Sequence, residues 1–184
     1  MLAEAEAKPR GPTAFLFEQL SELGVPVAVV HRAWRRQVDA EGQVVDFELI
    51  WPAADWRAKR DNDHSLVLSI RAAGRRVLLN GDVQQSAIEA MFEQGLDLSA
   101  DVTDLPHHGA FIPASQAWLD RVAPVVAIQS AGRDRLYIDP WAAVFDRRPK
   151  IERLVTAKSG LISVVITAQG QVVTRVFRQG ESSE

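Results

Sequence analysis

The stretch "RRVLLNGDVQQSAIEAMFEQGLDLSADVTDLPHHGA" (residues 75–110) carries the strongest structural pattern in the chain. An apolar run over 75–82 ends in Gly-Asp, and residues 83–95 follow a helical period that stops at a glycine. A second short apolar run occupies residues 101–105 and leads into two adjacent histidines. A strand, a helix and a strand in this order predict parallel strands in an α/β fold.

Antiparallel hairpins are expected on either side of this unit. Residues 65–82 contain two β-rich runs around an Ala-Gly step, and residues 160–178 contain another pair around a turn at 168–170. Between residues 105 and 157 the helical and strand patterns alternate. Hairpins next to alternating elements predict mixed sheets with flanking helices.

The region before residue 65 predicts one helix and two strands. Thr13 stands where an N-cap is expected, and apolar residues recur at helical spacing over 14–23, before Gly24. Residues 25–31 predict a buried strand. Residues 42–52 alternate as a second strand that stops at a proline.

The composition limits the class of protein. The chain has 184 residues, enough for one compact domain, and its 24 acidic and 21 basic residues give a net charge of −3. This charge provides no global field to attract nucleic acid or an anionic membrane. Because there is no cysteine, a metal could be held only by His, Asp, Glu or backbone oxygen. No apolar window approaches the roughly 18 residues of a membrane helix, so no membrane segment is expected in this chain.

Asp82 and the pair His107-His108 are the main candidates for chemistry. Each follows an apolar strand, so both loops can open at the same edge of one sheet. Carboxylate and neutral imidazole suit Zn, Mn or Fe, and three ligands plus a water molecule is a common catalytic pattern. Two plainer interpretations stay open: Asp82 as the N-cap of a helix that begins near Val83, and the histidines as polar loop residues.

The other candidates favour ordinary structural roles. His31 ends a predicted strand, and His64 lies among turn-forming residues. The five tryptophans are scattered, which favours core packing over base stacking. The basic stretch "HRAWRR" (31–36) is either a phosphate contact or a solvated loop, and the loop is the simpler interpretation.

The ordered segments "NDHSLVLSI", "VLLNGD", "LPHHG", "VAIQSAG" and "RLYIDP" together resemble the metallo-β-lactamase-fold domain of ComEC-type DNA-internalisation competence proteins. The resemblance covers about residues 47–166, and "PHHG" is its most specific part. It implies that Asp82 bridges two metal ions and that His108 binds one of them. His107 would then support a ligand from behind or transfer a proton.

The chain departs from the family pattern in two places. The motif His-x-His-x-Asp-His, which normally precedes these segments, does not occur in residues 1–184. The family tends to have His-Pro-His after the tyrosine of the late loop, whereas this chain has "YIDPW", with Asp139 in that region. Asp139 could still accept a proton or bind a metal. Asp82, His107 and His108 offer at most three ligands, too few for a complete two-metal hydrolytic site.

The resemblance therefore implies the later half of a metallo-β-lactamase-like αββα sandwich, with mixed sheets and flanking helices. We expect a flexible lead over residues 1–12, a single partial domain over 13–178 and a disordered tail over 179–184. A half sandwich leaves a sheet face uncovered, so an upstream segment or a partner chain is expected to complete it.

Two functions follow from the resemblance. The first is metal-dependent hydrolysis of phosphodiester bonds, with DNA as the partner and Zn or Mn as the metal, provided that upstream ligands are supplied. Asp82, His107 and Asp139 would then be catalytic, and Asp82, His108 and His107 would face the metal. The second is a catalytically inactive, degenerate module that acts in binding or assembly. Full-length members of the family are membrane-associated bacterial proteins, but the residues of this chain do not indicate its location.

Overall fold

The computed structural model describes residues 12–28, 30–40, 42–58 and 60–177. The chain divides into two compact units, Met1–Val30 and His31–Glu184. The expected tail over 179–184 lies outside the described residues, and so does the expected lead except for residue 12.

The described part of the first unit contains one helix, α1 (Pro12–Glu22), as the spacing over 14–23 predicts. It ends near Gly24, where φ is 66° and the N–H donates to the carbonyl of Ser21. Three of its large apolar side chains, Phe15, Leu16 and Phe17, are exposed.

The buried strand predicted over residues 25–31 is wrong. The described residues of this segment have no strand pairing, and Val25 and Val27 are exposed. The periodicity over 25–31 could not show this, because a strand also needs a neighbour that accepts its backbone hydrogen bonds.

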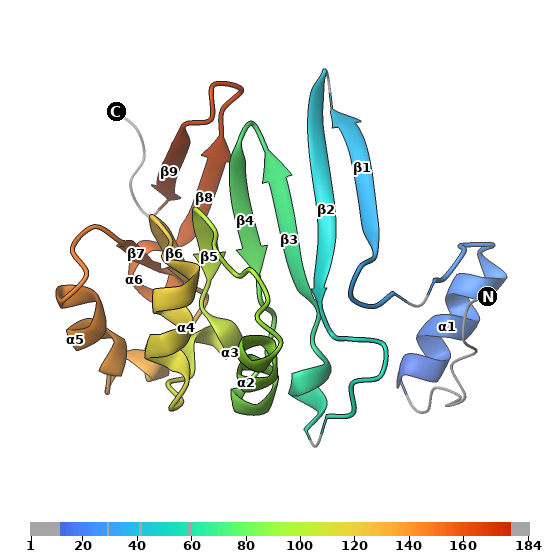
Figure 1. The fold of residues 1–184 in the computed structure, drawn as a ribbon, viewed down its shortest axis with the longest axis horizontal. Helices are drawn as coiled ribbons and strands as arrows, with labels where there is room; N and C mark the ends of the chain where they lie inside the picture. The colour runs from blue at the N-terminus through green and yellow to red at the C-terminus, as the bar shows by residue number, and fades with distance from the viewer. Residues whose placement is uncertain (1–11, 29, 41, 59, 178–184) are drawn as a thin grey trace. The chain divides into compact units, whose positions relative to one another are not determined.

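Nine strands form two sheets in the described residues of the second unit (Figure 1). The seven strands of the larger sheet lie side by side in chain order. They are β1 (Arg35–Ala40), β2 (Gln43–Trp51), β3 (Val67–Ala72), β4 (Arg75–Leu79), β5 (Val102–Asp104), β6 (Val126–Gln129) and β7 (Glu152–Val155). The smaller sheet is the hairpin of β8 (Leu161–Ile166) and β9 (Val172–Phe177).

The larger sheet is mixed, as the sequence predicts. The pairs from β1 to β4 are antiparallel and the pairs from β4 to β7 are parallel. The change occurs at β4, where the hairpin over 65–82 meets the strand–helix–strand unit over 75–110. The carboxyl ends of β4, β5 and β6 therefore share one edge of the sheet.

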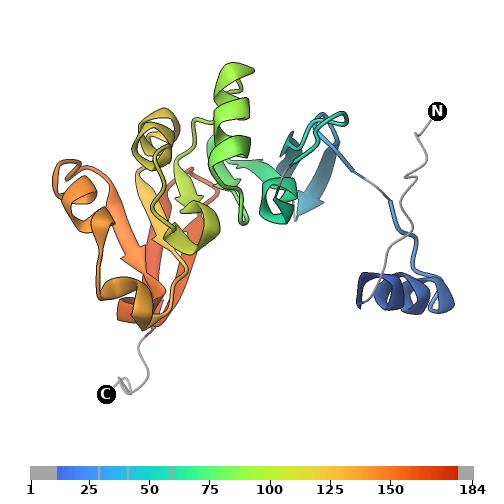
Figure 2. The same ribbon diagram turned by 90° about the horizontal axis from the view of Figure 1, so that it is seen from below.

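Three helices lie on one face of the larger sheet (Figures 1 and 2). They are α2 (Gln85–Glu93), α4 (Ser115–Val122) and α5 (Pro140–Asp146). Their buried side chains pack with sheet residues such as Leu78 into the hydrophobic core. Trp51, Trp118 and Trp141 are almost fully buried in this core, as expected for the tryptophans, whereas Trp34 is 37% exposed.

The hairpin β8–β9 contacts the opposite face of the larger sheet. Arg75 Nε donates to the carbonyl of Gly170, and the hydroxyl of Thr174 contacts the carboxylate of Glu152. Register places Arg75 on the same face as Val77, the face away from α2. The hairpin predicted over 160–178 is thus confirmed.

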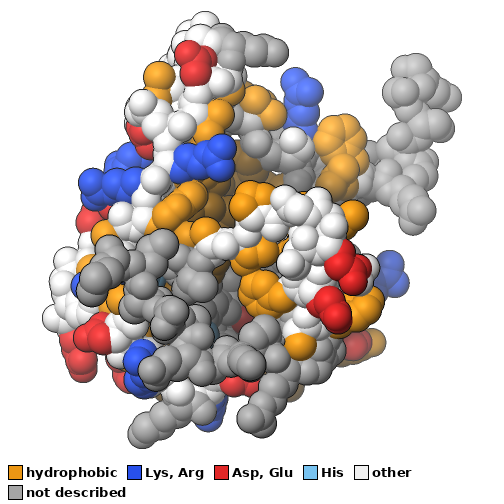
Figure 3. Space-filling model, turned by 90° about the vertical axis from the view of Figure 1, so that its right-hand side faces the viewer, with side chains coloured by type: hydrophobic (Ala, Val, Ile, Leu, Met, Phe, Trp, Pro, Cys, Tyr) orange, Lys and Arg blue, Asp and Glu red, His pale blue; other side chains and the backbone are white. Residues whose placement is uncertain are grey.

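Apolar side chains continue along that second face into β2 and β3. Cross-strand register aligns one row of Phe47, Ile70 and Val77, which are partly exposed. A second row runs from the buried Leu49 through the partly exposed Leu68 to Leu79, which is 41% exposed. Hydrophobic side chains also reach the surface beside charged ones on the face drawn in Figure 3. The larger sheet therefore carries apolar surface on a face without helices.

Strand β1 was not anticipated by the sequence patterns. The basic stretch "HRAWRR" was expected to be a loop, yet Arg35 and Arg36 begin β1 and pair with β2. Arg35 forms an ion pair with Glu48 across the two strands. A polar edge strand has no alternation of apolar residues, so its hydrogen bonds to β2 define it.

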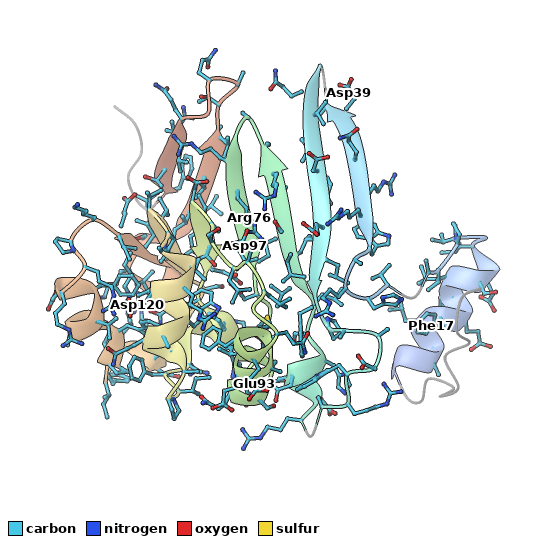
Figure 4. The ribbon with its side chains drawn as sticks, in the orientation of Figure 1. Phe17, Asp39, Arg76, Glu93, Asp97 and Asp120 are labelled. Carbon is cyan, nitrogen blue, oxygen red and sulfur yellow. The ribbon has the colours of Figure 1, made fainter. Side chains whose placement is uncertain are left out.

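An ion pair between a buried arginine and an exposed aspartate lies at the edge of the sheet opposite the histidines. Arg76 of β4 donates to Asp97 Oδ2 at 2.7 Å and to the hydroxyl of Ser69 at 2.7 Å (Figure 4). The Arg76 side chain is almost fully buried.

No helix in the described ranges has the length and apolar character needed to cross a bilayer.

Candidate functional site

The loops after β4 and β5 meet at the shared edge of the sheet. The backbone N–H of His107 donates to the carbonyl of Gly81 at 3.0 Å, and His108 Nε2 lies 3.5 Å from Asp82 Oδ1. Because β4 and β5 are parallel neighbours, their carboxyl ends bring these loops together. The proximity expected from the sequence is therefore present.

The two histidines occupy an unusual backbone conformation. The single turn α3 (Pro106–Gly109) holds His107 at φ 49° and His108 at φ 57°, and Gly109 follows at φ 75°. The left-handed region costs an L-residue about 1–2 kcal/mol. A side chain at Gly109 would also place its Cβ 2.6 Å from the amide nitrogen of Gln129. The surrounding contacts must hold this turn, and such strain is characteristic of functional sites.

Two contacts from other elements hold the turn. Trp141 of α5 donates its Nε1–H to the carbonyl of Gly109 at 2.8 Å. The amide of Gln129 at the end of β6 lies 3.5 Å from the carbonyl of His108. These groups come from later parts of the chain, so the conformation of the histidine turn is set by tertiary contacts.

His108 is oriented as a metal ligand would be. Its Nδ1 lies 3.0 Å from the carbonyl of Ser130, which can only accept a hydrogen bond, so Nδ1 carries the proton in the neutral ring. The lone pair of Nε2 is then directed to the side where Asp82 lies. The side chains of His108 and Asp82 are 56% and 41% exposed. A carbonyl that fixes the second ring nitrogen is the usual support of a metal-binding histidine.

His107 has different surroundings. Its Nδ1 lies 2.9 Å from the side-chain amide nitrogen of Gln84, and its Nε2 lies 3.5 Å from that of Asn62. Both partners are amide nitrogens, which donate, and a neutral imidazole accepts at only one ring nitrogen; the shorter contact makes Nδ1 the acceptor of the Gln84 N–H. His107 is half-buried, so these contacts make it a support of the loop rather than a second open ligand.

The helix-cap interpretation of Asp82 is not favoured by the structure. The N-cap position of α2 is occupied by Gln84, two residues after Asp82, and the start of this helix contacts Asp63 of the short helix η1 (Asp61–His64). One Asp63 carboxylate oxygen accepts from the backbone N–H of Gln84 at 2.8 Å, and the other accepts from the hydroxyl of Ser86. The Asp82 side chain is thus free of that role.

Asp139 forms an ion pair away from the other candidates. Both of its oxygens accept from the guanidinium of Arg153, at 2.7 and 2.9 Å, and Arg153 also contacts Gln129 Oε1. Burial opposes ionisation of Asp139, but the hydrogen bonds and charge of Arg153 outweigh it, so the pKa of Asp139 is lowered. The structure therefore pairs Asp139 with Arg153.

A further carboxylate, Asp104, lies behind the site and was not singled out in the sequence. Its Oδ1 accepts from the backbone N–H of Asn80 at 2.8 Å and from the Asn80 side chain at 2.9 Å. Burial raises the pKa of Asp104, and the charge of Asp82 adds to this effect. Asp104 thus ties the end of β5 to the residue that precedes Gly81-Asp82. The sequence feature that could have singled out Asp104 is its position at the end of a strand, just before "PHHG".

The variant Asp104→Asn is expected to gain stability relative to the wild type as pH rises. A carboxyl whose pKa is raised by folding binds its proton more tightly in the folded state, so it disfavours folding once it ionises. The pH-dependent part of the difference in unfolding free energy between the variant and the wild type should be absent below the unfolded pKa of about 3.9. It should grow until pH passes the raised folded pKa. Urea unfolding at several pH values measures it.

Asp120→Asn, which removes an exposed carboxylate on α4, is the control for the loss of one charge. A constant difference in unfolding free energy between Asp104→Asn and wild type from about pH 4 to 7 would contradict the assignment.

The described residues do not complete a metal centre. Asp82 and His108 supply two ligands, whereas a catalytic zinc site has three protein ligands and a structural site has four. Within the described ranges no group of three or more His, Asp or Glu side chains is placed to hold an ion. The pair is compatible with metal binding, but the described residues do not fit a full catalytic centre.

The chain is similar in part to longer bacterial proteins. No family model matches the chain. It is 34% identical to the competence protein ComA of Neisseria gonorrhoeae over 104 residues, 56% of this chain and 15% of that protein. It is 28% identical to ComE operon protein 3 of Bacillus subtilis over 143 residues, 77% of this chain and 18% of that protein.

A third relative is recombination protein 2 of Haemophilus influenzae, 33% identical over 114 residues. That match covers 62% of this chain and 14% of the relative. The chain thus spans less than a fifth of the length of each of these proteins. One of these relatives is named a competence protein and another a recombination protein.

Proposed function

We propose that this chain works in DNA uptake as the later part of a metallo-β-lactamase-like domain. Within it, Asp82 and His108 form one half of a divalent-metal centre. The complete centre would hydrolyse phosphodiester bonds once ligands from an upstream segment or a partner chain join the pair. Zn²⁺ or Mn²⁺ fits the imidazole and carboxylate donors.

The observation that carries this proposal is the orientation of His108. A solvated loop histidine has no need of a fixed tautomer, whereas this ring is held at Nδ1 by the carbonyl of Ser130 and faces Asp82 with Nε2. The strained turn that presents the ring costs free energy, which a loop without a ligand would not need to spend. The similarity to competence proteins supplies the DNA-uptake context.

The proposal assigns different tasks to the other candidate residues. His107 holds the two loops together through Gln84, and its neutral ring stays close to the site as a polar group. Asp139 contributes through its ion pair with Arg153, which supports Gln129 beneath the histidine turn. Neither residue needs to touch a metal for the pair Asp82 and His108 to bind one.

A binding or assembly module without catalytic activity is the second candidate. It is favoured by the apolar rows that include Phe47, Ile70 and Leu79, because such a face is stabilised by a covering partner. Light scattering tests it directly. Self-association through this face supports the module, and a well-behaved monomer weakens it.

The metal-binding proposal predicts a clear effect of removing either ligand. Protein purified without chelator and titrated with Zn²⁺ or Mn²⁺ by calorimetry should bind one ion, and Asp82→Ala or His108→Ala should weaken binding by more than about tenfold. Loss of a direct ligand removes a coordination bond, so the effect should exceed that of His107→Ala.

His31→Ala is the matched control, because His31 is an exposed histidine outside this site whose ring contacts the carbonyl of Arg32. If the wild type binds no more metal than Asp82→Ala, the metal role of the pair is excluded. Cleavage of DNA by the metal-loaded chain once the completing segment or partner is supplied, abolished in Asp82→Ala, would favour the hydrolase over the inactive module.

A further inference from the structure

We propose that the groove beside His108 binds single-stranded DNA, stacking a base on exposed aromatic rings and contacting phosphate through arginines. The inference rests on the proposed DNA-uptake function and names its substrate class. The groove encloses about 310 Å³ and begins at Gly109, the residue after His108. Among the residues that line it are Gly109, Phe111, Gln129, Arg135, Tyr137 and Trp141.

Two aromatic rings give the groove stacking surfaces. Tyr137 is 85% exposed, and Phe111 is 39% exposed while its ring packs edge-on against Trp141 at 5.1 Å. The buried Trp141 fixes Phe111, so that ring needs little further ordering when a base stacks on it. Exposed aromatic rings in a groove are the usual platform for unstacked bases.

The charge of the same loop suits a phosphate backbone. The short helix η2 (Arg133–Leu136) carries Arg133 and Arg135, both exposed. Within the described parts of the chain, no ion pair involves either guanidinium. Asp134 offsets one of the two charges, and Asp139 is neutralised by Arg153. Asp134 and Arg135 both line the groove, so its lining is neutral overall, and Arg133 beside it gives the loop one net positive charge.

These features favour a single strand over a duplex. A duplex keeps its bases stacked on one another, so the faces of Phe111 and Tyr137 would have no base to receive. A single strand in the groove would pass next to His108 and Asp82, because Gly109 joins the groove to the histidine turn. The groove thus places a phosphodiester backbone beside the candidate ligand pair.

The test is fluorescence anisotropy with a labelled oligothymidylate of about 15 nucleotides, at low salt and in the presence of EDTA. Wild type should bind, Tyr137→Ala should raise the Kd about tenfold, and Tyr137→Phe should bind like wild type because the ring is kept. Arg135→Ala should weaken binding and lower the salt dependence by about 0.7 in the slope of log K against log salt.

Arg71→Ala is the charge-matched control, since Arg71 is exposed next to the hairpin turn at the opposite edge of the sheet. Equal affinities of wild type, Tyr137→Ala and Arg135→Ala would overturn the inference, as would an equal loss in Arg71→Ala. It would also fail if Tyr137→Ala dissociated a dimer in light scattering while DNA binding stayed unchanged, because the groove would then serve a protein partner.

Chelator keeps this test separate from the metal proposal. DNA binding in EDTA combined with absent metal binding would leave the groove assignment in place and remove the metal centre. Metal binding by Asp82 and His108 without any DNA binding would keep the metal centre and remove the groove assignment.

Discussion

Truncation of Trp141 to alanine is expected to lower the free energy of unfolding by about 3–5 kcal/mol. The indole is 1% exposed and packs against Phe111 and Phe145, with ring centroids at 5.1 and 5.6 Å. The substitution opens a cavity in the core and also removes the hydrogen bond to the carbonyl of Gly109. Urea unfolding followed by circular dichroism measures the loss.

Two further variants separate packing from hydrogen bonding. Trp141→Phe keeps most of the ring volume but leaves the Gly109 carbonyl without its donor, so we expect a smaller loss of about 1–3 kcal/mol. Phe177→Ala, which truncates an exposed ring on β9, should cost less than about 1 kcal/mol. If Trp141→Ala were as mild as Phe177→Ala, Trp141 would not be the support of the histidine turn.

Replacement of Arg153 by alanine is expected to destabilise the fold by about 3 kcal/mol. Arg153 and Asp139 are 9% and 14% exposed, so the variant leaves a nearly buried carboxylate without its main partner. It also removes the guanidinium from Gln129 Oε1, beneath the histidine turn. The loss should be largest near neutral pH. Because the folded pKa of Asp139 is lowered, the contribution is present above its unfolded pKa and lost as pH falls through the folded value.

Lys158→Ala provides a matched control for this ion pair. Lys158 Nζ lies 3.9 Å from the same carboxylate, but its side chain is 59% exposed, so the attraction is screened by water. We expect a small change for Lys158→Ala. Comparable losses in the two variants would mean that Asp139 is not held by Arg153, and would reopen a catalytic role for Asp139.

The order of elements in the second unit was largely predictable because its signals are local. The hairpin turn at 73–74, the glycine after α2 and the alternation in β2 each occur within a few residues. Two strand predictions were wrong: one predicted strand is absent from the described residues, and one observed strand was not predicted. The apolar segment 25–31 forms no strand in its described residues, and the polar segment of β1 forms one. In both cases the pairing partner, which lies elsewhere in the chain, determines whether a strand exists.

The approach of Asp82 to His108 was also predictable, because parallel neighbouring strands end at one edge of their sheet. The contact between Asp63 and the start of α2 was not predictable, because Asp63 lies 21 residues before Gln84, whose backbone N–H it accepts from. The burial of Asp104 and the ion pair of Asp139 escaped sequence reasoning for the same reason. Their partners Asn80 and Arg153 are ordinary polar residues with no distinctive local pattern.

Periodicity and motif order in the 184 residues are sufficient to infer an α/β chain with a mixed sheet and an edge where a carboxylate and two histidines meet. The motif order also carries the family resemblance, which implies His108 as a metal ligand and His107 as its support. How each ring is held is decided by the carbonyl of Ser130, which fixes the ring of His108, and by the amide of Gln84, which contacts His107. These partners are distant in sequence, so only the tertiary structure determines them, whereas helices and hairpin turns follow from residues close together.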